Sequence, residues 1–175
     1  MEEADLSRQE ELTARAKERG ITIVRLSDEV QRSPAYLRSL HELHNAIQTD
    51  VPRAGYFTPM PYQEFAEEFS RGTHLPDGYF IAKRGERYVG QSYLQTSSGD
   101  PYTLEVGLTG VRREYRRQGI AAALKLHTLS YAKEHGFRAI ETGSDSSNQA
   151  ILALNESDGF RKTYAWVTFE KQLTW

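Results

Sequence analysis

The sequence predicts an α/β fold: one mixed, mostly antiparallel sheet of six to seven strands, flanked by helices. Three observations lead to it. Segments rich in β-branched and aromatic residues alternate with amphipathic segments in the order β-α-α-β-β-β-α-β-α-β. A long run of helix formers separates two strand candidates, which should then lie parallel in the sheet. The 175 residues suffice for one domain with one sizeable core.

A further helix is predicted ahead of the sheet. Ser7-Arg8-Gln9-Glu10 is typical of a capping box with Ser7 as the N-cap, and Gly20 is placed to end the helix. Its apolar face is thin, so we expect it to pack on the edge of the domain. We therefore divide the chain into an N-terminal helical extension over residues 1–20 and one domain over residues 21–175.

The remaining elements follow from periodicity and from the glycines, prolines and polar turns between them. Strands are predicted over residues 21–26, 79–82, 88–95, 102–111, 139–142 and 163–171. Helices are predicted from Ser33-Pro34 onward, around Phe65 and Phe69, over residues 117–135 and over residues 147–156. Residues 50–61 contain three prolines and no period, which predicts a loop.

Composition excludes several classes of protein and site. The absence of cysteine rules out disulfides, thiolate zinc sites and a cysteine nucleophile. A net charge of -2 gives no support to nucleic-acid binding. No segment is apolar enough for a membrane span or a secretory signal, so we expect a cytoplasmic protein without a membrane partner. His41 and His44 lie three apart without a third ligand at suitable spacing, so we expect no metal.

The segment from Val111 to Ala121 predicts an anion-binding turn. A strand ends there, a polar turn with arginines at positions 112, 113, 116 and 117 follows, and a long helix begins. Free backbone N–H groups at a helix start carry partial positive charge, and Gly119 lets a phosphate approach the backbone closely. The Walker pattern and the dinucleotide-binding glycine pattern are both absent. The predicted ligand is therefore a di- or polyphosphate of another kind.

The spacing Arg116-x-x-Gly119-x-Ala121 resembles the coenzyme A signature [QR]-x-x-G-x-[GA] of the GNAT superfamily of acetyl-CoA-dependent N-acetyltransferases. Asn148 and the run from Leu154-Asn155 to Gly159-Phe160 are similar to that family as well, as is the order of the elements. The resemblance covers roughly residues 21–171. It implies a GNAT fold in which two parallel central strands splay apart and bind acetyl-CoA in the gap.

The resemblance also implies a set of residues that contact the cofactor. Glycines at positions 107 and 110 would suit a strand that must diverge, since glycine inside a strand often marks a bulge or a close approach. Asn148 has an alternative reading as a simple helix N-cap. The expected cofactor-binding residues are Thr109, Val111, Arg116, Arg117, Gln118, Gly119, Ile120, Ala121, Asn148 and Asn155.

The reaction implied is acetyl transfer to a primary amine, by direct attack of the deprotonated amine on the thioester. Glu105, eleven positions before Arg116, resembles the family's catalytic glutamate and is the expected base; the alternatives are a glutamate paired with a cross-strand neighbour and a water-mediated route. Many family members carry a tyrosine where this chain has Asn155. Tyr164 or Ser157 would have to replace it as the acid.

The acceptor is expected to be a small molecule bound near Asp50, Tyr56 and Tyr93, although a loop aspartate also forms turns. Two other functions stay open. The missing tyrosine at position 155 allows a non-catalytic acyl-CoA-binding module or sensor, and an open acceptor cleft would favour a protein N-terminal or lysine acetyltransferase. The family's usual seventh strand has no counterpart in the sequence. A neighbouring subunit could supply it, so a homodimer is one expectation.

Overall fold

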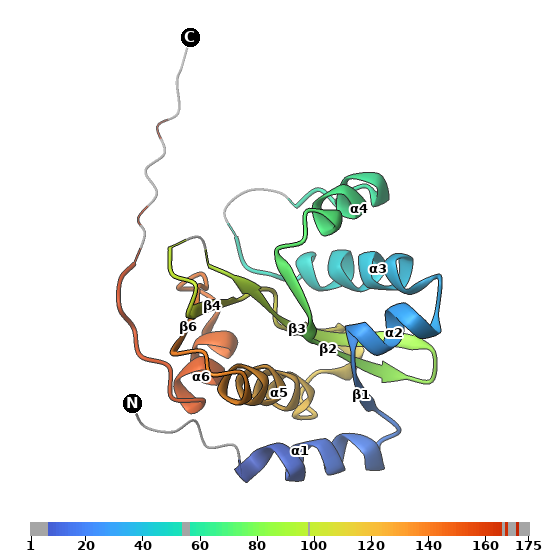
Figure 1. Ribbon diagram of the computed structural model, residues 1–175, viewed down its shortest axis with the longest axis horizontal. Helices are drawn as coiled ribbons and strands as arrows, with labels where there is room; N and C mark the ends of the chain where they lie inside the picture. Colours follow the sequence, from blue (N-terminus) through green and yellow to red (C-terminus); the bar gives the residue numbers. More distant parts are fainter. Residues whose placement is uncertain (1–6, 54–56, 98, 166, 168–170, 172–175) are drawn as a thin grey trace.

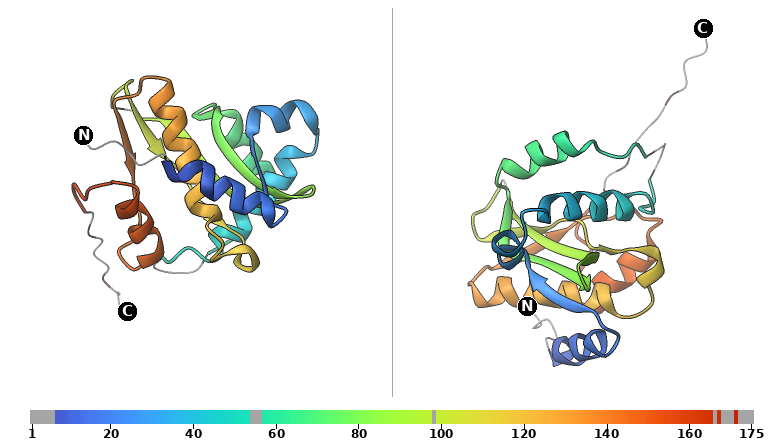
Figure 2. Two further views of the ribbon diagram at one scale, coloured as in Figure 1. Left: turned by 90° about the horizontal axis from the view of Figure 1, so that it is seen from below. Right: turned by 90° about the vertical axis from the view of Figure 1, so that its right-hand side faces the viewer.

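A six-stranded sheet lies between two layers of helices in the computed structural model, which describes residues 7–53, 57–97, 99–165, 167 and 171. One layer consists of α2 (Leu26–Arg32), α3 (Tyr36–Gln48) and α4 (Tyr62–Ser70). On the opposite face lies α5 (Ile120–Glu134), with α1 (Ser7–Glu18) packed outside it (Figures 1 and 2). The predicted α/β class and flanking helices are confirmed.

The strands follow the order β1-β2-β3-β4-β6, and β5 pairs with β3 beside this path. Their bounds are β1 (Thr22–Arg25), β2 (His74–Arg84), β3 (Arg87–Thr96), β4 (Thr103–Val106), β5 (Gly110–Val111) and β6 (Ala139–Thr142). All pairs are antiparallel except β4 with β6, whose parallel register joins Thr103 to Ala139 and Val106 to Thr142. The predicted parallel pair around the long helix is therefore confirmed. The single strand predicted over residues 102–111 is two strands, parted at residues 107–109.

Two helical segments complete the fold, η1 (Arg113–Tyr115) before α5 and α6 (Gln149–Ser157) after β6. The sequence analysis did not predict α2, which begins where the first strand ends. Asp28 and Glu29 in its first turn are the signal that was available, because acidic side chains favour a helix N-terminus. Glu29 is buried there and accepts hydrogen bonds from Lys83 Nζ at 2.8 Å and Tyr88 Oη at 2.7 Å.

Three apolar clusters hold the layers together. Phe80, Val89 and Leu124 pack between the sheet and α5, and the same cluster includes Ala16 of α1. A second cluster fills the space between the sheet and the α3–α4 layer. A third lies under β4 and contains Leu104 and the α5 residue Ala132. Because each large apolar side chain contributes about 1.5–3 kcal/mol when buried, these clusters fix the strands that border the site.

The final strand predicted over residues 163–171 is wrong for the part of it that the structure describes. Residues 163–165, 167 and 171 belong to no strand, and the other four lie outside the described residues. Tyr164 is 69% exposed and Val167 73% exposed. Alternating apolar residues favour a strand only where a neighbouring strand and a buried face are available, and the described residues here have neither.

Candidate functional site

A cavity of about 290 Å³ lies beyond the ends of the parallel pair β4 and β6. Residues 106–109, between β4 and β5, form one wall, and residues 142–145, after β6, form the facing wall. The end of α3 contributes Gln48, Tyr93 projects from β3, and α6 closes a further side with Asn148, Ile151 and Asn155. The cavity is thus built from the ends of the two parallel strands, a usual place for ligands in α/β folds.

The parting of the strands depends on two glycines. A Cβ placed on Gly107 would lie 2.0 Å from Tyr93 Cε2, and one on Gly110 would lie 2.3 Å from Ile47 Cγ2. Neither distance is sterically allowed, so only glycine lets the backbone run this close to β3 and α3. The backbone N–H of Gly107 also donates to the carbonyl of Tyr93 at 2.9 Å. The divergence of the chain expected from these glycines lies between β4 and β5, at residues 107–109.

The turn before α5 has the backbone expected of an anion site. Arg117 (φ 61°) and Gly119 (φ 77°) are both left-handed, and Gly119 is the N-cap of α5 with no side-chain cap. Turns of this kind aim N–H groups at a common point, and the first N–H groups of a helix have no partner within it. Ile120 and Val111 are buried in the core, so only their backbones could touch a ligand.

Two of the turn's arginines are already paired. Arg116 Nη2 donates to Asp50 Oδ2 at 2.6 Å, and Arg113 donates to both oxygens of the same carboxylate. The hydrogen bond from Arg113, with the charge of Arg116 beside it, holds the pKa of Asp50 below its usual value. Asp50, which is expected near the acceptor, has its carboxylate between two cations, where it links the loop after α3 to the turn before α5.

The expected base, Glu105, is half-buried on β4 directly before the cavity wall. Gln95 Nε2 of the neighbouring strand donates to Glu105 Oε2 at 3.1 Å, which is the cross-strand pairing named as an alternative. Glu105 also lies opposite Glu141 in the parallel register, which puts a second carboxylate on the same face. The other catalytic candidate, Tyr164, is exposed and is not among the residues that line the cavity.

The two asparagines of α6 both line the cavity. Asn148 is the N-cap of α6, and its Oδ1 accepts from the N–H of Ile151 at 3.3 Å. The same residue lines the cavity, so the N-cap role does not remove it from the ligand space. Asn155 is buried, and its Oδ1 accepts a hydrogen bond from Lys125 Nζ of α5. Thr109, a further expected cofactor contact, lines the cavity and shares a hydrogen bond with Ser92 at 2.9 Å.

The side of the cavity that Tyr93 lines is aromatic. The Tyr93 ring stacks on Tyr79 at a centroid distance of 4.6 Å and lies 5.0 Å from the His74 ring. Burial raises the pKa of the Tyr93 phenol, which keeps it protonated at neutral pH. Tyr56, the third acceptor residue expected from the sequence, lies outside the described residues.

Several cavity residues were not predicted. Gln48, Val51, Ile151 and the segment over residues 143–145 line the cavity, and Lys125 supports Asn155 from behind. The segment after β6 was predictable in principle, because chain leaving the carboxyl end of a parallel strand commonly lines a site. Lys125 was not, since a lysine inside a helix is normally a surface residue.

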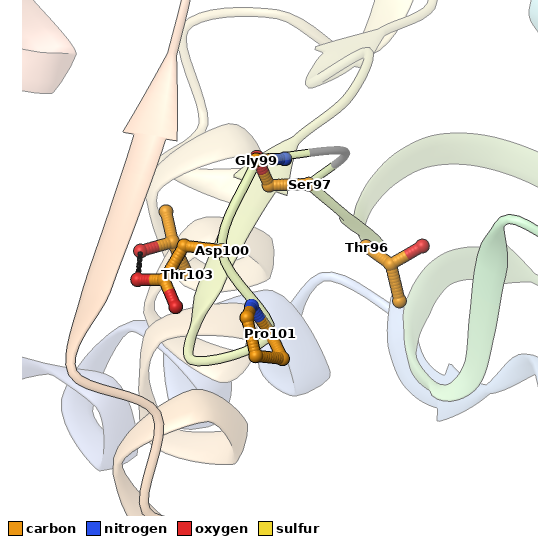
Figure 3. A pocket seen from close by; sticks show the side chains of 6 residues that line it. All are labelled: Thr96, Ser97, Gly99, Asp100, Pro101 and Thr103. Atoms are coloured by element: carbon orange, nitrogen blue, oxygen red, sulfur yellow. Dashed lines mark hydrogen bonds between the residues drawn. The ribbon is translucent and has the colours of Figure 1, made fainter.

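A second hollow lies at the β3–β4 connection and is lined by small residues, among them Thr96, Asp100 and Thr103 (Figure 3). Asp100 Oδ2 accepts from Thr103 Oγ1 at 2.8 Å, and Asp100 Oδ1 accepts from the N–H of Tyr102 at 3.0 Å. The carboxylate is therefore used to shape the turn. No described group of His, Asp or Glu side chains is arranged to hold a metal ion. Among the described helices, none has the length and apolar character needed to cross a membrane.

Comparison with known proteins identifies the class and then the family. The family model of the acetyltransferase (GNAT) family matches residues 37–160, which include every wall of the cavity. The class is therefore an acetyltransferase. The chain belongs to the acetyltransferase (GNAT) family.

Two curated relatives and two solved structures show the range of the similarity. The chain is 32% identical over 91 residues to mycothiol acetyltransferase of Thermobispora bispora, spanning 50% of this chain but only 31% of that protein. It is 26% identical over 133 residues to N-alpha-acetyltransferase 30 of Schizosaccharomyces pombe, covering 75% and 81%.

The solved structures support the fold. The ribosomal-protein-S18-alanine N-acetyltransferase of Escherichia coli superposes with a TM-score of 0.62 at 19% identity, over 82% of this chain and 79% of that one. AAC(6')-Iy, solved with a bisubstrate analogue containing CoA, gives 0.61 at 16% identity, over 87% and 99%.

Proposed function

We propose that this chain acetylates the primary amine of a small molecule, with acetyl-CoA in the cavity beyond the ends of β4 and β6. The observation that carries the proposal is that the cavity wall over residues 107–109 leads along the chain, through β5 and η1, to the helix start at Gly119, which has no side-chain cap. A diphosphate held at the turn would let the extended pantetheine arm run along residues 107–109 toward Tyr93.

The residues present fit such a cofactor. Gly119 has no side chain at the turn, where its Cβ would lie 3.2 Å from Leu12 Cδ2 of α1. The segment over residues 107–109 offers backbone groups along one wall of the cavity, as in strand addition. Asn148 and Asn155 line the opposite side of the same space. Arg117 adds positive charge that Asp50 does not neutralise, because Asp50 bonds only to Arg113 and Arg116 among the described residues. Acetyl-CoA would supply the activated acetyl group.

Glu105 is the proposed base. The amine must lose a proton before or during attack, so that the new C–N bond forms as the C–S bond breaks and the sulfur leaves as a thiolate. Glu105 stands on the face that Gln95 shares, one residue before the cavity wall, and takes the proton directly or through one water. The thiolate finally takes up one proton, which balances the reaction.

A second acceptor class has its own support. The match to an N-alpha-acetyltransferase covers 75% of this chain, more than the match to the mycothiol enzyme. Gln48 and Val51, at and after the end of α3, also line the cavity, and a peptide could contact them there. An N-terminal amine of a peptide is therefore the alternative to a small molecule.

The test has two stages. Acetyl-CoA and CoA should raise the melting temperature while ATP does not, because a ligand that binds only the native state stabilises it. Release of thiol is then measured with a panel of small amines and short peptides. Turnover with a small amine supports the proposal, and turnover with peptides alone favours the second acceptor class.

The role of Glu105 is tested by Glu105→Gln, with Glu141→Gln as the matched control on the neighbouring strand. We expect a loss of about 10²-fold or more in kcat/KM for the first and little change for the second. Equal effects would remove Glu105 from the reaction. No shift with either CoA species would contradict cofactor binding altogether, and binding without turnover would indicate a sensor. The homodimer also remains a proposal, tested by measuring the mass in solution.

A further inference from the structure

Lys125 is a charged residue at a buried position, where an apolar side chain would be expected. It lies in the middle of α5, its side chain is 1% exposed, and its Nζ donates to Asn155 Oδ1 of α6. The ammonium also lies 4.2 Å from the centroid of the Phe160 ring. Burying a charged lysine is costly, so a lysine at this position calls for a partner or a role that an apolar residue could not supply.

The contact fixes the orientation of the Asn155 amide. A lysine ammonium can only donate hydrogen bonds, so the atom of Asn155 that faces it must be the oxygen. The NH₂ group of the same amide must then point away from Lys125. Asn155 lines the cavity, whereas Lys125 lies behind it among the residues of α5 and α6. The amide therefore presents N–H donors, and not its oxygen, toward the ligand space.

The surrounding charges favour this arrangement. Asp158, at the end of α6, has Oδ2 3.9 Å from Lys125 Nζ, and that oxygen has no hydrogen-bond partner among the described residues. The charge of Arg8 of α1 also favours the ionised form of Asp158, and among the described residues Asp158 is the charged group that acts on Lys125. Burial lowers the pKa of Lys125 to about 8, with Asp158 opposing the shift, so the amine is charged at neutral pH.

We propose that Lys125 is a positioning residue for acetyl transfer: it holds Asn155 so that the amide N–H donates to the sulfur of CoA as the thiolate departs. This inference rests on the proposed function. As the C–N bond forms and the C–S bond breaks, the electron pair of the broken bond stays on sulfur. The N–H donor stabilises that charge without giving up its proton, and the thiolate is protonated later by water. The Asn155 amide, held by the Lys125 ammonium, thus stabilises the thiolate where many other members of the family have a titratable tyrosine.

The experiment measures the acidity of the bound product. CoA is bound to the full-length protein, and the ultraviolet absorbance of its thiolate is followed as a function of pH, with free CoA as the reference. We expect the pKa of the bound thiol to lie below that of free CoA by about one unit or more. Lys125→Met should return it toward the free value, and Lys133→Met, at an exposed position of the same helix, should leave it unchanged.

A second variant keeps the proposal falsifiable if Lys125→Met does not fold. Asn155→Asp retains an oxygen for Lys125 but has no N–H to donate, so the thiol pKa should rise and kcat should fall about tenfold or more, with KM for acetyl-CoA nearly unchanged. If CoA binds and the thiol pKa is the same in wild type, Lys125→Met and Asn155→Asp, the inference is overturned while the proposed function stands. Absence of CoA binding would overturn both.

Discussion

The close contact between Gly107 and Tyr93 predicts a large effect for one added methyl group. In Gly107→Ala the new Cβ would lie 2.0 Å from Tyr93 Cε2 and 2.2 Å from Cζ. The ring has little freedom to yield, since it stacks on Tyr79, which is itself buried and donates from its hydroxyl to Gln91 Oε1 at 3.0 Å. Overpacking of this kind costs about 1–3 kcal/mol. For a chain of this size, that lowers the melting temperature by about 2–12 °C.

A double-mutant cycle makes the reasoning specific. Tyr93→Leu removes the three atoms nearest the new methyl group, which are Cε2, Cζ and Oη of Tyr93. In that background Gly107→Ala should change the free energy of unfolding by less than about 0.5 kcal/mol. Urea denaturation followed by circular dichroism measures all four proteins. Gly99→Ala is the control, because its Cβ would meet nothing within 4 Å. An equal cost of Gly107→Ala in both backgrounds would refute the steric account.

Three further perturbations test other parts of the site. In Gly119→Ala a left-handed residue gains a Cβ 3.2 Å from Leu12 Cδ2, which should cost at least about 1–2 kcal/mol and weaken CoA binding. Gly136→Ala, with a φ of 74° and nothing within 4 Å of its Cβ, should cost no more than this in stability and leave CoA binding unchanged, as calorimetry would show. Asp50→Asn removes the carboxylate that pairs with Arg113 and Arg116, so we expect CoA to bind about threefold to tenfold more tightly. Asp77→Asn is the control. Unchanged or weaker binding would contradict competition between Asp50 and phosphate for the two arginines. Burial lowers the pKa of His44 to about 4, so between pH 4 and about 6.5 the unfolded state binds more protons than the folded state, and stability falls on acidification by up to roughly 3 kcal/mol. In His44→Leu the free energy of unfolding, measured by urea denaturation across that range, should therefore depend less on pH. An unchanged dependence on pH would assign the effect to other groups.

The sequence predicts the parts of this protein that depend on local signals. The N-terminal helix, the long helix after Gly119 and the parallel pair around that helix are all indicated by local patterns, and each is present. The final strand over residues 163–171 depends on a neighbour that the described residues do not provide, so its alternating pattern was misleading. The same limit applies to side-chain partners. Nothing local in the sequence indicates that Asp50 is paired with Arg113 and Arg116 across more than sixty residues.

The cavity itself follows from how β3 is shared. One strand pairs with β4 at Leu94–Thr96 and with β5 at Gly90–Gln91, while β6 pairs with β4 alone. The chain between β4 and β5 is drawn toward β3 by the bond from the Gly107 N–H to the Tyr93 carbonyl, and this movement is sterically open only to glycine. Among the described residues, β6 has no comparable contact with β3, and the two walls separate beyond Val106 and Thr142. The position of the wall over residues 107–109 therefore depends on how closely the backbone of Gly107 packs against Tyr93.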